Sequence, residues 1–314
     1  MVSFGFERVV RYRTKAWTLD VAINVLLLGV DGGGTNCRAR LADCEGRTLG
    51  EGVAGPANIR FGVRESFAAV LRATDQCWEQ AGPSYRNRDI VACLAMAGAS
   101  EPLDATAAQS YPHPFLRMVL TSDARAACMG AHAGQDGGII IAGTGTVGWA
   151  TIAGREHRVG GWGFPVSDEG SGAWLGCEAV RRVLWAHDGL IDWSSFLRCV
   201  YQMFDSDPHA IVRWMSVARP RDFASLAPVV AEHAMQADPV AEELMHGGAA
   251  CLDTMATRLM DLGVSRLSVV GGLAKEMAPL LSKRVQDVLV QPQGDALTGA
   301  LRLAQSEAEH LELR

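Results

Sequence analysis

Short apolar runs that end in glycine, aspartate or threonine recur along the chain. The first, LLLGV at 26–30, stops at Asp31 and is followed by three glycines and a threonine. Two later runs, GGIIIA at 137–142 and LSVV at 267–270, also lead directly into glycine turns. An apolar run of this length that is bounded by turn residues is typical of a buried strand. The pattern therefore predicts buried strands whose ends open into tight turns.

Segments with apolar residues at helical spacing lie between these strands. RESFAAVLRATDQCWEQAG, at 64–82, is predicted to form a helix that stops at Gly82-Pro83. A second helix is predicted over 171–189, with Ser171 as its N-cap and Gly189 just past its end. Each half of the chain has the same order of elements: an apolar strand, a Gly/Thr turn, a second strand and then helices. We therefore predict two α/β domains with a cleft between them.

Composition and charge exclude several classes of protein. Apolar residues make up 48% of the chain and charged residues 20%, as in a soluble globular protein. The net charge of −6, with scattered Lys and Arg, argues against nucleic acid or an anionic membrane surface as the main partner. No apolar stretch approaches the ~20 residues of a membrane span. The eight cysteines include no C-x-x-C pair, which argues against a zinc ribbon or a cysteine-held cluster. Reduced thiols and the lack of a signal peptide predict a cytoplasmic protein.

Three glycine-rich turns follow the apolar strands, at Asp31–Thr35, Gly143–Gly148 and Gly271–Ala274. Glycine lets backbone segments approach closely and adopt positive φ, so that successive N–H groups can converge on phosphate oxygens. A tight hairpin turn is the simpler interpretation of any one of them. Three such turns, each at the end of a strand, favour phosphate binding.

Two known phosphate motifs fail on the sequence. A P-loop requires lysine after its last glycine, and Thr35 occupies that position. The residues Gly143, Gly145 and Gly148 have the spacing of the dinucleotide fingerprint, but that fingerprint must open a helix. Here the following residues, TVGWATIAG, alternate as in a strand, so the match is taken as accidental.

Six segments together resemble the N-acetylglucosamine kinase and BadF/BadG-type ATPase family, within the actin, sugar-kinase and Hsp70 superfamily. They run in order from residue 26 to residue 304: LLLGVDGGGTNCRARLAD, TSDARAA, IIIAGTGTVGWA, GGWGFPVSDEGSGAWLG, SVVGGLA and DALTGALRLA. The fourth is the most specific and points to bacterial amino-sugar kinases. The resemblance implies two actin-like, ribonuclease H-like domains, 23–122 plus 295–314 and 123–294, with an ATP- and sugar-binding cleft between them. Residues 1–22 are expected to be a disordered leader.

The resemblance also implies roles in nucleotide binding. The first two glycine turns would bind the β- and γ-phosphates of ATP, and the third would pack against the adenosine. The implied ATP-binding residues are Gly33, Gly34, Thr35, Asn36, Thr144, Thr146, Gly271, Gly272, Ala274 and Asp295. Asp31 would orient Mg²⁺ through water, since Mg²⁺ prefers oxygen ligands and retains waters.

The catalytic base implied by the resemblance is Asp123, in VLTSDARAA. It would accept the proton of the sugar 6-hydroxyl as that oxygen attacks the γ-phosphate. An aspartate at the end of a strand is also a common helix N-cap, and SDARAACMGA permits that alternative.

The segment GGWGFPVSDEG is the best candidate for sugar contact, because an indole face can stack on a pyranose while carboxylates accept hydroxyl or ammonium protons. The resemblance implies a sugar site made of Asn58, Gly98, Thr144, Gly145, Gly161, Trp162, Asp168 and Glu169. The letters FPVSDE replace the MMGDE-like segment of the animal enzymes. The environment of the sugar 2-substituent and the direction of Glu169 therefore stay open.

The leading functional hypothesis is an ATP-dependent kinase that makes glucosamine 6-phosphate or N-acetylglucosamine 6-phosphate. The alternative is an ATPase activator module of the 2-hydroxyacyl-CoA dehydratase or benzoyl-CoA reductase type, whose cysteines hold a cluster at a dimer interface. A non-enzymatic sugar sensor would require a helix-turn-helix, for which the 22-residue leader is too short. The family resemblance also predicts a homodimer.

Overall fold

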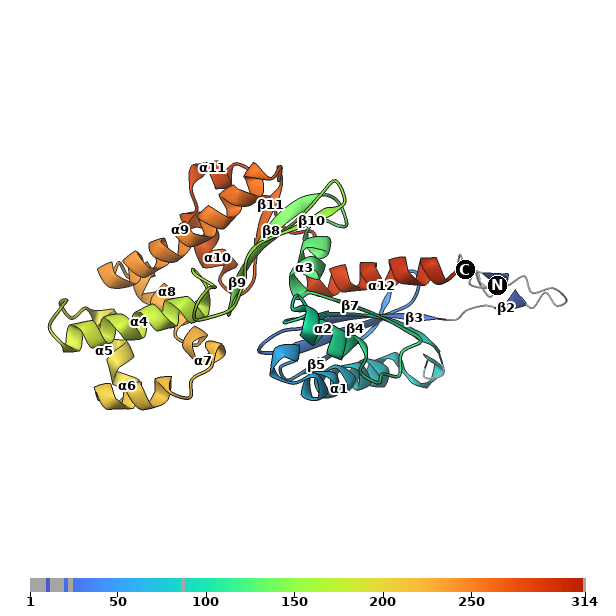
Figure 1. Ribbon diagram of the computed structural model, residues 1–314, viewed down its shortest axis with the longest axis horizontal. Helices are drawn as coiled ribbons and strands as arrows, with labels where there is room; N and C mark the ends of the chain where they lie inside the picture. The colour runs from blue at the N-terminus through green and yellow to red at the C-terminus, as the bar shows by residue number, and fades with distance from the viewer. Residues whose placement is uncertain (1–9, 12–19, 22–24, 86–87, 313–314) are drawn as a thin grey trace, which may run out of the picture. The chain divides into compact units, whose positions relative to one another are not determined.

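The computed structural model describes residues 10–11, 20–21, 25–85 and 88–312. The chain forms two compact units, residues 1–126 with 296–314 (unit 1) and residues 127–295 (unit 2) (Figure 1). The predicted disordered leader falls mainly outside the described residues. Within it the structure describes two short strands, β1 (Val10–Arg11) and β2 (Asp20–Val21), which pair antiparallel.

Unit 1 contains a five-stranded sheet of order β5-β4-β3-β6-β7. The strands are β3 (Leu26–Gly32), β4 (Cys37–Ala42), β5 (Thr48–Ala54), β6 (Ile90–Met96) and β7 (Arg117–Thr121). β3, β4 and β5 form an antiparallel meander, while β6 and β7 run parallel to β3. Asp31 is in register with Ala95, and Ala95 with Thr121. The carboxyl ends of three neighbouring strands therefore meet at one edge of the sheet.

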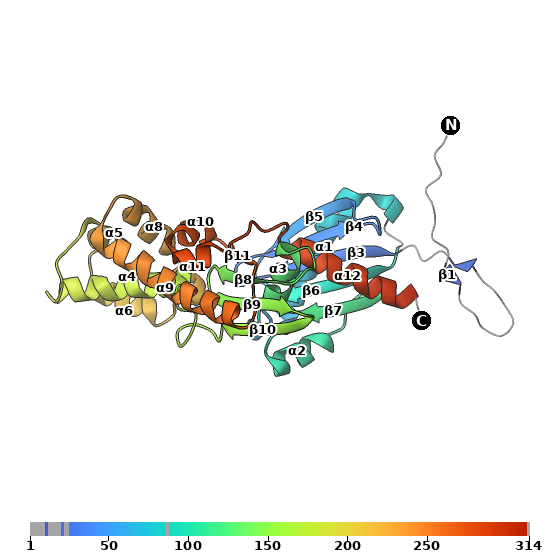
Figure 2. The same ribbon diagram turned by 90° about the horizontal axis from the view of Figure 1, so that it is seen from above.

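Helices cover both faces of this sheet, as Figure 2 shows from above. They are α1 (Val63–Ala81), α2 (Pro102–Gln109), α12 (Ala296–Glu312) and the start of α3 (Asp123–Ala131), with short η1 (Ile59–Phe61) and η2 (Pro83–Tyr85). On β3, Leu26 and Leu28 pack with Phe67 of α1. Leu27, between them, packs against Ala300 of α12. Burial on both faces explains why this strand is apolar throughout.

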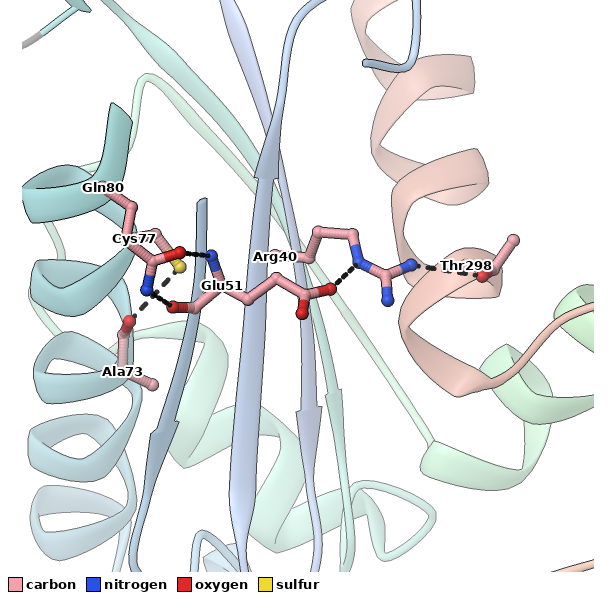
Figure 3. Close-up of polar contacts among 6 residues, drawn as sticks. All are labelled: Arg40, Glu51, Ala73, Cys77, Gln80 and Thr298. Atoms are coloured by element: carbon pink, nitrogen blue, oxygen red, sulfur yellow. Dashed lines mark hydrogen bonds and ion pairs between the residues drawn. The ribbon is translucent and has the colours of Figure 1, made fainter. Parts of the chain in front are cut away.

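Helix α1 also closes the edge of the sheet at β5. The Gln80 amide accepts from the Glu51 N–H at 3.0 Å and donates to the Glu51 carbonyl at 2.6 Å (Figure 3). Gln76, one helical turn earlier, makes the same pair of bonds to Val53, each at 2.9 Å. The side chains thus satisfy backbone groups that an edge strand would otherwise offer to another strand.

Two glycines of β5 allow α1 to approach this closely. A Cβ atom at Gly50 would lie 2.3 Å from the Cys77 carbonyl oxygen, and one at Gly52 would lie 1.9 Å from the Ala73 carbonyl oxygen. On β4, Arg40 donates to the Glu51 carboxylate at 2.6 Å and to the Thr298 hydroxyl of α12 at 3.5 Å (Figure 3).

Unit 2 repeats the strand order of unit 1. Its sheet has the order β10-β9-β8-β11, and the strands are β8 (Gly137–Ala142), β9 (Thr146–Ile152), β10 (Arg155–Gly160) and β11 (Leu267–Val270). β8 and β9 pair antiparallel, as do β9 and β10, whereas β11 runs parallel to β8. A single parallel bridge between Leu267 and Leu289 stands where unit 1 has its fifth strand.

The helices of unit 2 include the one predicted over 171–189, which is α4. They are α4 (Gly172–His187), α5 (Ser195–Gln202), α6 (Pro208–Met215), α7 (Pro220–Ala224), α8 (Ala227–Met235), α9 (Pro239–Asp261), α10 (Ala274–Met277), η3 (Ala278–Leu280) and α11 (Lys283–Gln286). The predicted N-cap is confirmed, since Ser171 accepts from the Trp174 N–H. After the third glycine turn the chain forms three short helical pieces, with Pro279 in the middle one. Across the described ranges, no helix is long and apolar enough to cross a membrane.

Replacing Gly52 with alanine should destabilise unit 1, because the added Cβ would overlap the Ala73 carbonyl and push α1 off the sheet edge. We expect Gly52→Ala to lower the free energy of unfolding by about 1–3 kcal/mol. Gly55→Ala is the matched control, since a Cβ there would meet nothing within 4 Å. Urea unfolding should separate the two variants, and equal midpoints would contradict the close packing described here.

Candidate active site

The turn after β3 combines a tightly packed glycine with open ones. A Cβ at Gly32 would lie 2.6 Å from the Met96 sulfur, whereas a Cβ at Gly34 would meet nothing within 4 Å. The Gly33 N–H donates to the Asn36 carbonyl at 2.9 Å and closes the turn. Gly34, Thr35 and Asn36 are exposed. Open space over exposed backbone fits a phosphate group, with the Thr35 hydroxyl as a further donor.

Asp31 lies beside this turn and forms an ion pair. Its Oδ2 accepts from Arg38 Nη2 at 2.7 Å and from Nε at 3.3 Å. The two residues are direct cross-strand partners on β3 and β4, so the pairing follows from the register. The Asp31 side chain is 19% exposed. No cluster of three metal-ligating side chains occurs among the described residues. A single carboxylate still fits Mg²⁺, which is usually held by one or two carboxylates plus substrate phosphates.

Asn58 and Gly98 come together next to the same turn. The Ala57 N–H donates to the Gly33 carbonyl at 3.0 Å. Asn58 caps the short helix η1, and its Oδ1 accepts from the Arg60 N–H at 3.1 Å. Gly98 has a φ of 90°, and a Cβ there would lie 2.9 Å from Asn58 Oδ1. Two predicted sugar-binding residues therefore adjoin the predicted phosphate turn.

Asp123 begins α3 at the carboxyl edge of the unit 1 sheet, two residues after Thr121. The hydroxyl of Ser122 accepts from the Arg125 N–H at 3.2 Å, which is the bond expected of an N-cap. Asp123 Oδ1 accepts from the Ala124 N–H at 2.9 Å. The capping bond to the third residue of the turn thus comes from Ser122. Asp123 is half-buried at the N-terminus of α3.

The two glycine turns of unit 2 lie side by side, because they follow the parallel strands β8 and β11. Gly271 has a φ of 105°, and a Cβ there would lie 2.4 Å from the Ala142 carbonyl oxygen. The Leu273 N–H donates to the same carbonyl at 2.9 Å. Gly272 is exposed with open space above it, which resembles the situation of Gly34. Ala274 opens α10 directly after this turn.

The turn after β8 also supports the start of α4. The Gly172 N–H donates to the Gly143 carbonyl at 2.8 Å, and the Ala173 N–H donates to the Thr144 carbonyl at 3.2 Å. These bonds satisfy N–H groups that a helix leaves without partners at its first turn. Thr146 is buried, and its hydroxyl has no hydrogen-bond partner within the described part of the chain.

The carboxylate of Asp168 lies against the turn after β8. A Cβ at Gly145 would be 2.7 Å from Asp168 Oδ2, so only glycine fits there. Asp168 itself has a φ of 70°, which is unusual for a residue with a side chain. Burial raises its pKa above the usual range, and hydrogen bonds from the backbone of Gly163, Thr146 and Phe164 oppose the rise.

The loop before Asp168 presents an exposed indole. Trp162 is 73% exposed, and the Arg158 guanidinium carbon lies 4.4 Å from its ring centroid. Gly161 is half-buried with a φ of 71°. Glu169, whose direction the sequence left open, is exposed.

The structure thus gathers the predicted site residues into one group in each unit. In unit 1 they are Asp31, Gly33, Gly34, Thr35, Asn36, Asn58, Gly98 and Asp123, and in unit 2 they are Thr144, Gly145, Thr146, Gly161, Trp162, Asp168, Glu169, Gly271, Gly272 and Ala274. Asp295 lies apart from both groups in the sequence, directly before α12. Sequence reasoning missed Arg38 and Arg158, because their importance depends on a cross-strand register that letters alone do not give.

Each unit therefore has the actin-like α/β sheet with glycine turns at one edge, which is the arrangement of a nucleotide-phosphate-binding protein. The BadF/BadG/BcrA/BcrD ATPase family matches residues 28–304. The chain is 39% identical over 284 residues to glucosamine kinase GspK of Vibrio cholerae serotype O1. The aligned residues cover 90% of this chain and 96% of that protein. The chain belongs to the BadF/BadG/BcrA/BcrD ATPase family, and this membership implies the use of ATP.

Solved structures agree with this assignment. The crystal structure of a protein from Chromobacterium violaceum, provisionally named N-acetylglucosamine kinase, matches with a TM-score of 0.83 and 33% identity over 90% of this chain and 99% of that one. A glucokinase of the ROK family from Streptomyces griseus matches with a TM-score of 0.55 at 20% identity, over 90% of this chain and 98% of that one. The second match shows a shared fold alone. The predicted fold class is confirmed.

The raised pKa of Asp168 predicts how its replacement depends on pH. Above the raised pKa of Asp168 the folded protein holds a buried carboxylate. The free energy of unfolding therefore falls as pH rises from the pKa of Asp168 in the unfolded protein through its higher pKa in the folded protein. Asp168→Asn removes this titration. Relative to wild type, the variant should therefore gain in free energy of unfolding as pH rises from about 3.5 to 7. Urea unfolding across this range tests the sign, and parallel stability curves would contradict the burial of Asp168.

Proposed function

We propose that this protein is an ATP-dependent amino-sugar kinase that phosphorylates the 6-hydroxyl of N-acetylglucosamine or glucosamine. The observation that carries the proposal is the position of Asp123. It stands at the same sheet edge as Asp31 and the first glycine turn, and Ser122 makes the capping bond in its place. The names of the relatives, both amino-sugar kinases, support the same reaction.

The proposed nucleotide site uses backbone donors more than side chains. Exposed Gly34 and Thr35 in unit 1, and the turns at Thr144 and Gly272 in unit 2, would donate N–H groups to the phosphates and the nucleotide. Thr146 is retained as a proposed nucleotide contact through its hydroxyl, which has no partner among the described residues, whereas its backbone donates to Asp168. Asp295, at the start of α12, is retained as a proposed nucleotide contact.

Mg²⁺ would neutralise charge on the transferring phosphate when it is bound. Asp31 is the proposed ligand, through water. Arg38 holds the Asp31 carboxylate in place and offsets part of its charge, which suits an indirect contact better than a direct one.

Asp123 would accept the proton of the sugar hydroxyl as that oxygen attacks the γ-phosphate and the bond from the phosphorus to the β-phosphate oxygen breaks. Phosphoryl transfer is achieved mainly by positioning and charge stabilisation, so the proton is needed late. The place of Asp123 at the first residue of α3 sets the carboxylate at the carboxyl edge of the sheet, beside the first glycine turn.

The proposed sugar site combines one apolar surface with several acceptors. The exposed Trp162 indole would cover the C–H face of the ring, while Asn58 and Asp168 would bind hydroxyl groups. Exposed Glu169 is the acceptor that suits a 2-ammonium group. We also propose that the enzyme is a homodimer that works in the cytoplasm.

Asp123→Asn should remove the base while preserving the size of the side chain. We expect kcat to fall by about 10²–10⁴ with little change in ATP affinity. ADP release would be followed with ATP, Mg²⁺ and a panel of glucosamine, N-acetylglucosamine, N-acetylmannosamine, glucose or no sugar. Asp192→Asn, at an exposed position, is the matched control and should behave as wild type.

Two outcomes would count against the proposal. Wild-type ADP release that no sugar stimulates would favour an ATPase that drives a partner protein. Sugar-dependent turnover that survives Asp123→Asn would remove Asp123 from the role of base.

A further inference from the structure

The exposure of Trp162 does not come from a loose loop. The backbone N–H of Trp162 donates to the Ser167 hydroxyl at 3.3 Å, and the backbone N–H of Ser167 donates to the Gly163 carbonyl at 3.0 Å. The ring of Phe164 packs 5.1 Å from that of Phe223 on α7. The backbone on both sides of the indole is therefore fixed, while the indole itself is 73% exposed. An indole held outside the core on a fixed backbone can present its apolar face to a ligand.

Arg158 lies under this indole because of the sheet register. It is the cross-strand partner of Trp149, which in turn pairs with Ile139, so the three side chains share one face of the unit 2 sheet. From this face the guanidinium extends past the end of β10. Its Nε donates to the Gly160 carbonyl at 3.0 Å, and its Nη2 donates to the Gly161 carbonyl.

The two glycines give Arg158 carbonyls that it can bind together. Gly160 and Gly161 have φ values of 70° and 71°. A Cβ at Gly160 would lie 2.9 Å from the Met255 sulfur, and one at Gly161 would lie 2.7 Å from the Val147 side chain. Both positions therefore require glycine, and the chain turns there so that consecutive carbonyls meet one planar guanidinium.

The same guanidinium covers one face of the Trp162 ring, with its central carbon 4.4 Å from the ring centroid. Arginine suits this place because its flat group can stack on an aromatic face while its edge donates hydrogen bonds. Lysine offers a point charge and cannot do both.

We propose that Arg158 is a positioning residue for sugar binding: it fixes the Trp162 indole with one face against the guanidinium and the other face turned to the substrate ring. The step from indole to sugar rests on the proposed function, whereas the placement of the indole does not. A side chain that is already ordered loses less conformational freedom on binding, so the gain should appear in sugar affinity.

The first experiment measures the indole in the ligand-free protein. The fluorescence of Trp162 is obtained as the difference between wild type and Trp162→Phe. The same difference is then taken between Arg158→Met and the double variant Arg158→Met with Trp162→Phe. We expect Arg158→Met to raise the acrylamide quenching of this difference signal. Arg182→Met is the matched control, because Arg182 covers Trp185 at 4.6 Å on α4 and should leave the Trp162 signal unchanged. Unchanged quenching in Arg158→Met would overturn the placement.

The second experiment measures sugar and ATP kinetics. Arg158→Met should raise the sugar KM by about three- to tenfold, with kcat and the ATP KM nearly unchanged. Arg158→Lys should restore only part of the loss, and serves in place of Arg158→Met if that variant fails to fold. In a Trp162→Ala background the Arg158 substitution should have no further effect on the sugar KM.

The outcomes separate this inference from the proposed function. If the Arg158 substitution raised the sugar KM by the same factor in the Trp162→Ala background, the positioning role would be overturned. Wild-type protein with no sugar-dependent turnover would reject the proposed function, and the fluorescence measurement would then decide the indole placement by itself.

Discussion

The site depends on glycine turns whose backbone lies too close to neighbouring atoms for a side chain to fit without displacing them. Gly32 faces the Met96 sulfur, Gly145 faces the Asp168 carboxylate, and Gly271 faces the Ala142 carbonyl, each at a distance that excludes a Cβ atom. These contacts set the path of each turn at the carboxyl ends of parallel strands. Gly34 and Gly272, in contrast, have open space above them. The packed glycines fix the turns, and the open ones leave room for a ligand.

Three aspartates at these edges have different surroundings and can therefore serve different purposes. Asp31 is paired with Arg38 on the neighbouring strand. Asp123 is half-buried at a helix N-terminus. Asp168 is buried against backbone, and burial raises its pKa. In the proposed mechanism one residue type would supply a metal-facing charge, a proton acceptor and a hydrogen-bonding group, because the fold places each in its own environment.

Much of the fold follows from local signals in the sequence. The buried strand β3, the N-cap Ser171 and helix α1 are predicted from apolar runs, capping residues and helical spacing. What local signals cannot give is register. Arg38 opposite Asp31 and Arg158 opposite Trp149 are contacts across strands, and a shift of one residue would turn these side chains to the other face. The roles of the site residues stay predictions, since they came from a resemblance in sequence.

The measurement that tests the central claim most directly is the identity of the phosphorylated product. The protein would be incubated with ATP, Mg²⁺ and either glucosamine or N-acetylglucosamine, and the mixture followed by phosphorus NMR. The account predicts a phosphate monoester coupled to the two protons on the sugar's C6, formed in step with ADP. Inorganic phosphate as the sole product beside ADP, whichever amino sugar is present, would contradict it.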